Sequence, residues 1–102
     1  MHASQTRRTS RWAIRPSIVD ETNTPQGAYA LRKLEAVLPA GGPRYTITLS
    51  VSPALGAEAF DITRTARDIR VRGGDARGLV YGALALRDEL RTGTTLASIE
   101  PT

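Results

Sequence analysis

The sequence predicts an α+β fold, a two-layer sandwich in which a small, mostly antiparallel sheet carries two helices on one face, in the order β-α-β-β-β-α. Four short stretches alternate apolar with polar residues, which is typical of half-buried strands, and two longer stretches repeat apolar residues at helical spacing. The length of 102 residues suits one small domain with a single modest core.

The first part of the chain predicts a strand followed by a helix. Apolar and polar residues alternate over residues 12–18, and Pro16 places this strand at a sheet edge or ends it early. Thr24 then precedes Pro25, which is the order of an N-cap residue and a first helical proline. Leucines recur at helical spacing over residues 31–38, so an amphipathic helix follows, and a run of prolines and glycines ends it.

The middle of the chain predicts three further strands. Residues 45–51 alternate most regularly and give the clearest strand. Residues 60–63 and 68–72 alternate in the same way, so the chain must reverse direction between them, near residues 65–67. No Asn-Gly pair is present there to indicate the turn type.

A second helix follows the last strand. Gly73 and Gly74 permit positive φ angles as the chain leaves that strand, and Asp75 is placed to cap the helix. Apolar residues share one helical face over residues 79–90, and Gly93 is a suitable C-terminal stop.

The glycines around this junction are interpreted as structural. The run over residues 73–78 matches neither the G-x-G-x-x-G nor the Walker spacing, and Asp75 would repel a phosphate, so turn and cap geometry is favoured over anion binding. Gly78 and Gly82, four residues apart, predict close packing of the helix backbone on the sheet.

The net charge of +4 comes from the start of the chain, where four arginines and no acid occur among the first nineteen residues. We therefore expect residues 1–11 to form a flexible Arg-rich leader, residues 12–93 a single α/β domain, and residues 94–102 a linker-like tail. A nucleic-acid-binding domain would carry a basic face across the fold. The distribution argues against nucleic acid as a partner and leaves a weak nucleic-acid arm as an alternative.

Several kinds of site are excluded by composition. The absence of cysteine removes disulfides and thiolate metal sites, and a single histidine, His2, removes a histidine-based triad or a multi-histidine metal site. No apolar run approaches the roughly 20 residues that span a bilayer, so no membrane partner is expected. The neighbouring acids Asp20-Glu21 and Asp88-Glu89 do not converge as a glycosidase pair must. We assign no catalytic residue, no cofactor and no metal.

The five aromatic residues divide into two groups. Trp12 and Tyr29 could stack a sugar ring if exposed, and they are the candidate binding residues. Tyr45, Phe60 and Tyr81 fall in core-like patterns, and we expect them inside the fold.

Three stretches carry a family resemblance. They are residues 18–38, residues 45–49, and the final hairpin and helix, whose start reads Gly78-Leu79-Val80-Tyr81-Gly82. In this order the chain resembles the N-terminal α/β accessory domain of β-N-acetylhexosaminidases and α-glucuronidases. In such enzymes the domain packs beside a (β/α)₈ barrel that holds the catalytic carboxylates. None of those carboxylates corresponds to a residue of this chain.

The resemblance implies a non-catalytic support domain of a glycoside hydrolase, packing beside a catalytic barrel that is absent from this chain. The chain alone would then not be an enzyme, its partner would be that barrel, and in isolation it would self-associate through the exposed docking surface. The alternative is a stand-alone carbohydrate-binding module. The sequence leaves the localisation unknown.

Overall fold

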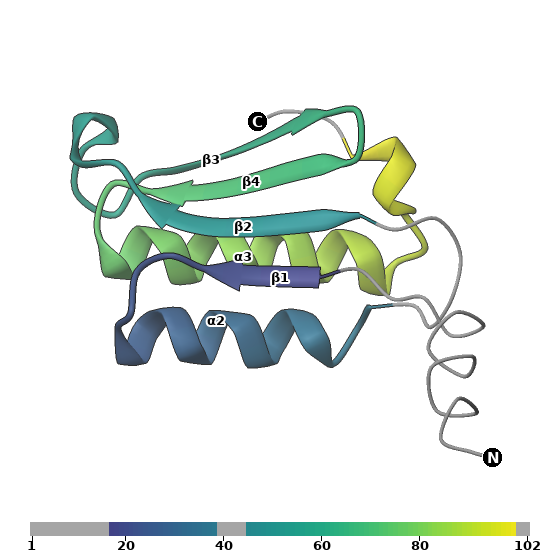
Figure 1. The fold of residues 1–102 in the computed structure, drawn as a ribbon, viewed down its shortest axis with the longest axis horizontal. Helices are drawn as coiled ribbons and strands as arrows, with labels where there is room; N and C mark the ends of the chain where they lie inside the picture. Colours follow the sequence, from purple (N-terminus) through teal and green to yellow (C-terminus); the bar gives the residue numbers. More distant parts are fainter. Residues whose placement is uncertain (1–16, 39–44, 100–102) are drawn as a thin grey trace, which may run out of the picture.

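The computed structural model describes residues 17–38 and 45–99. A four-stranded sheet forms one layer and two helices lie against one of its faces (Figure 1). The α+β two-layer sandwich predicted from the sequence is therefore confirmed. The elements are β1 (Ser17–Asp20), α2 (Pro25–Glu35), β2 (Thr46–Val51), the 3₁₀ turn η1 (Pro53–Leu55), β3 (Phe60–Thr65), β4 (Asp68–Gly73), α3 (Ala76–Arg91) and the 3₁₀ turn η2 (Leu96–Ser98).

The sheet is mixed rather than mostly antiparallel. Its strand order is β1-β2-β4-β3, with β1–β2 and β2–β4 parallel and only β3–β4 antiparallel. The difference has two causes. Helix α2 returns the chain to the starting end of the sheet, so β2 runs the same way as β1. The chain then passes to the outer edge for β3, and the hairpin brings β4 back between β3 and β2, parallel to β2.

The core lies between the sheet and the two helices. In register, Ile47 of β2 faces Ile69 of β4 and Leu49 faces Val71, and all four side chains are fully buried. Helix side chains at helical spacing close this surface from the other side. The fully buried helix residues are Ala30, Leu34, Leu79, Ala83 and Leu86.

Both predicted helix starts are confirmed by side-chain caps. The Oγ1 of Thr24 accepts a hydrogen bond from the backbone N–H of Gly27 at 3.0 Å, and Pro25 follows at the first helical position. The Oδ1 of Asp75 accepts from the backbone N–H of Gly78 at 2.7 Å. Each cap satisfies a backbone donor that the helix itself leaves without a partner.

The glycines of α3 allow the helix to approach the sheet closely, as the sequence predicted. A Cβ at Gly82 would lie 2.9 Å from the Cγ1 of Val71, and a Cβ at Gly78 would collide with the carbonyl oxygen of Ala59. Gly73 and Gly74 also allow close approach of the backbone, and neither adopts the positive φ that the sequence suggested. A Cβ at Gly74 would overlap the backbone of Gly56 in the η1 loop.

The segment after α3 packs onto the end of the domain. Leu96 is 5% exposed and Ile99 is 3% exposed, and both belong to the core cluster. The Nε of Arg64 donates to the carbonyl oxygen of Ile99 at 3.2 Å. The sequence predicts these residues in the linker-like tail, and the division of the chain into leader, domain and tail stays a prediction. The expected start of the first strand, residues 12–16, lies outside the described residues.

Candidate docking and binding surfaces

The side of the helical layer that faces away from the sheet carries apolar side chains. Tyr29 on α2 is 39% exposed and Tyr81 on α3 is 43% exposed. Val80 and Leu84 are half-buried and are not part of the core cluster, and their spacing places them beside Tyr81 on the outer side of α3. Because α2 and α3 pack against each other, we call these four residues the outer helical face.

Tyr81 was expected in the core, and that expectation is wrong. It lies one position before Gly82, the residue whose backbone touches the sheet, so its side chain turns about 100° away from the core. Tyr45 is buried at 9% exposure, and Phe60 is half-buried against the core, so the core assignment of those two is confirmed.

Tyr29, the candidate for sugar stacking, has an ionic neighbour. The Nζ of Lys33, one helical turn later, lies 5.2 Å from the centre of the Tyr29 ring, which is cation–π geometry. A sugar stacking on Tyr29 would have to use the opposite face of the ring. Trp12, the second candidate, lies outside the described residues, so a stacking role for the pair stays a prediction.

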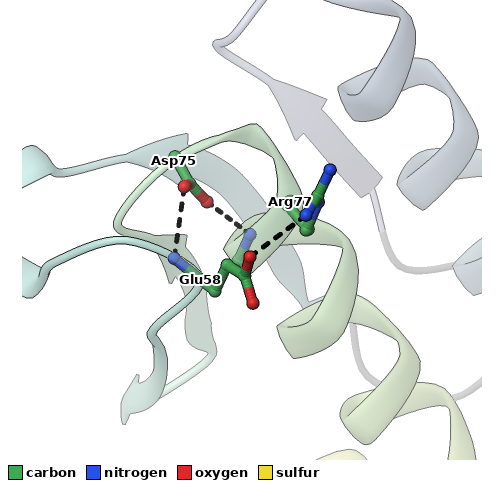
Figure 2. Close-up of polar contacts among 4 residues, drawn as sticks. Glu58, Asp75 and Arg77 are labelled. Atoms are coloured by element: carbon green, nitrogen blue, oxygen red, sulfur yellow. Dashed lines mark hydrogen bonds and ion pairs between the residues drawn. The ribbon is translucent and has the colours of Figure 1, made fainter.

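A polar junction joins the start of α3 to the loop before β3 (Figure 2). Besides capping Gly78, the Asp75 carboxylate accepts from the backbone N–H of Glu58 at 3.2 Å, and the Glu58 carboxylate is 3.1 Å from Nη1 of Arg77. The hydrogen bond from Gly78 is the main cause that holds the pKa of Asp75 below its ordinary value, while partial burial acts against it. This junction fixes two loops and presents negative rather than positive charge.

A cleft of about 620 Å³ opens where the parallel strands end and both helices begin. Ligands often bind in this position in open α/β sheets. Here the lining includes the carboxylates of Glu21 and Asp75, which oppose anions. The Thr22 hydroxyl is already used, because it donates to the Oδ1 of Asp20 at 2.6 Å. Within residues 17–38 and 45–99, no three His, Cys, Asp or Glu side chains gather as a metal site requires.

The face of the sheet opposite the helices is covered by no described helix (Figure 1). We call it the open sheet face. Arg72 and Asp61 form a two-pronged ion pair there, at 2.9 and 2.5 Å, that joins β4 to β3 in register. The remaining positions carry mostly threonine and serine hydroxyls, with one further arginine, one aspartate and one valine. Its residues are Ser17 and Val19 of β1, Thr46, Thr48 and Ser50 of β2, Asp68, Arg70 and Arg72 of β4, and Asp61, Thr63 and Thr65 of β3.

The fold is a small two-layer α+β domain, with two helices on one face of a four-stranded mixed sheet. The chain belongs to glycosyl hydrolase family 20, domain 2, because the model of that family matches residues 2–100. It is thus an accessory domain of a glycoside hydrolase and not the catalytic domain, and the resemblance drawn from the sequence is confirmed.

Solved structures agree on the fold. A GH138 enzyme targeting pectin rhamnogalacturonan II matches with a TM-score of 0.69 and 22% sequence identity, over 85% of this chain. The chain spans only 15% of the length of that enzyme. None of the curated proteins matches the chain significantly. No helix in the described part of the chain is both long enough and apolar enough to cross a membrane.

Proposed function

We propose that this chain is a non-catalytic support domain that packs beside the catalytic barrel of a glycoside hydrolase through its outer helical face. The observation that carries the proposal is the exposure of two tyrosines on the outer side of the helices, beside the half-buried Val80 and Leu84. Clustered apolar side chains on a surface mark interaction sites, and membership of an accessory-domain family supports an intramolecular partner.

The arrangement of the acids supports the non-catalytic role. Glycoside hydrolysis uses two carboxylates about 5–9.5 Å apart, facing one another across the sugar. In the described part of this chain, Asp61 is held by Arg72, Asp75 caps α3, and Asp88 lies 3.0 Å from Arg87. Asp20 accepts hydrogen bonds from the backbone and hydroxyl of Thr22. These carboxylates are committed to holding the fold.

The exposed surface of the two tyrosines is large enough to stabilise an interface. At 43% exposure, Tyr81 presents roughly 90 Å² of its surface to solvent, and Tyr29 presents a similar area. Burying each against a partner would contribute about 2 kcal/mol. Two such anchors are typical of the small cluster of residues that carries most of the energy of an interface.

Self-association of the chain tests this proposal, because a docking surface without its partner pairs with itself. Sedimentation velocity of the wild-type chain should show reversible self-association at concentrations of about 100 μM. The double variant Tyr29→Ser with Tyr81→Ser should weaken it at least about tenfold. Val51→Ser is the matched control, since Val51 is equally exposed at 39% but lies outside this face. A wild-type chain that stays monomeric at about 1 mM would contradict the docking proposal.

The exposed ring of Tyr29 also supports the second candidate, a carbohydrate-binding module. Titration with a neutral oligosaccharide, read by Trp12 fluorescence, should then show saturation that Tyr29→Ser abolishes. No change at millimolar sugar would rule this candidate out.

A further inference from the structure

We propose that the open sheet face holds a binding site for a carboxylate-bearing oligosaccharide, centred on Thr48 and Arg70. A shallow groove of about 510 Å³ lies there, formed by β2, β4 and the hairpin turn between β3 and β4. Its volume is within the range of small-molecule sites, about 300–1,000 Å³. The residues lining it are Thr46, Thr48, Thr65, Ala66, Arg67, Asp68 and Arg70.

The first argument is the state of Thr48. Its neighbours Ile47 and Leu49 point into the core, so the Thr48 side chain points to the open face, yet it is only 6% exposed. None of the side-chain hydrogen bonds between described residues involves its hydroxyl, although a hydroxyl this buried normally has a partner. Thr48 lines the groove, so we expect its hydroxyl to bond a ligand that enters it.

The second argument is the state of the arginines. Four of the eight described arginines have side-chain partners, whereas Arg67 and Arg70 are exposed and have no ion-pair partner within the described residues. Arg32 and Arg91 share this state, but they lie on the helices, away from the groove. Both line the groove, and the guanidinium fork matches a carboxylate with two parallel hydrogen bonds. The engaged groups are Arg64 on main-chain carbonyls, Arg72 on Asp61, Arg77 on Glu58 and Arg87 on Asp88.

The combination selects the chemical class of the ligand. A hexuronate offers one carboxylate and several hydroxyls per ring, which matches arginine beside threonine hydroxyls. Val19 lies in register across Thr48 from Arg70 and offers apolar contact for the C–H face of a sugar. Asp68 also lines the groove, so its carboxylate offsets one of the two arginines there. The single remaining positive charge suits a ligand with one carboxylate and disfavours a densely charged polyanion such as nucleic acid.

The test is a calorimetric titration of the chain with tetragalacturonate, with its fully methyl-esterified form as the neutral counterpart. The acid should bind and the ester should not. Arg70→Gln should weaken binding at least about tenfold, and Thr48→Val, which keeps the branched shape, about threefold or more. Arg91→Gln removes the same charge at the exposed end of α3 and should change binding less than about twofold.

Several outcomes would overturn the proposal. They are no binding of tetragalacturonate at about 5 mM, equal binding of the ester, or equal losses in Arg70→Gln and Arg91→Gln. Equal binding of oligo-dT with the same dependence on Arg70 would make this a general polyanion site and refute the sugar assignment. Tyr81→Ser should leave tetragalacturonate binding unchanged, so the proposed sugar site and the proposed docking face are tested independently.

Discussion

Replacement of Ile99 by alanine tests whether the segment after α3 belongs to the folded domain. Ile99 is 3% exposed, so Ile99→Ala removes three buried carbon atoms, each worth about 0.8 kcal/mol, or about 2.4 kcal/mol together. Substitutions of this kind in cores cost about 2–5 kcal/mol. The lower part of that range applies here, because the short segment after α3 can move inward to fill part of the space.

Urea unfolding of the 102-residue chain, followed by circular dichroism, measures this loss. The thermal midpoint should fall by about 10–15 °C in a domain of this size. Val51→Ala is the control, since Val51 is 39% exposed at the end of a strand, and it should cost less than about 1 kcal/mol. If Ile99→Ala costs less than about 0.5 kcal/mol, the segment does not unfold with the core and the reasoning is refuted.

Two further predictions concern the start of α3. Gly78→Ala should lower the free energy of unfolding, measured in urea, by about 1–3 kcal/mol, because the new Cβ would collide with the Ala59 carbonyl oxygen. Alanine ordinarily stabilises a helix relative to glycine, so a more stable variant would contradict the close packing. Asp75 has its pKa lowered from 3.8, so its stabilising effect is complete above that pH and is lost as the pH falls through the folded-state value. The urea midpoint of the wild-type chain should therefore fall more between about pH 5 and about pH 2.5 than that of Asp75→Asn. An equal fall in the two proteins would show that the Asp75 cap does not cause the loss of stability in acid.

The elements that the sequence predicted correctly are those set by local chemistry. Thr24 and Asp75 were identifiable as caps because a short polar side chain before a helical repeat satisfies free backbone donors, whatever the rest of the fold does. The alternation in β2 and β4 likewise depends only on one buried and one open face.

The strand pairing could not be predicted because it depends on distant contacts. Alternation shows that a strand has one wet face, and this is equally compatible with β4 lying at the edge or in the centre. The type of the hairpin turn could not be predicted either. The turn places Ala66 at a φ of 54°, and alanine rarely adopts a positive φ. Glu58 likewise adopts a positive φ of 60°, and its backbone N–H donates a hydrogen bond to the Asp75 carboxylate, a contact that the sequence does not reveal.

The candidate surfaces were predicted only in part. Tyr29 was named from the sequence, whereas Tyr81 was assigned to the core because it sits inside an apolar repeat. The informative signal was Gly82, since a glycine that touches the sheet fixes the orientation of the whole helix and turns its neighbour outward. The groove beside Thr48 leaves no sequence signature, because its residues come from strands that only the fold brings together.

The geometry of the sandwich also determines how the two proposed surfaces relate. The helices lie on one face of the sheet, so a partner on the outer helical face would leave the open sheet face in contact with solvent (Figure 1). Arg64 holds the segment after α3 against the sheet through the carbonyl oxygen of Ile99. An oligosaccharide bound at Arg70 would then lie on the face of the sheet opposite the docked partner. If both proposals hold, the two faces work separately: the helices contact the partner while the sheet binds an acidic sugar chain.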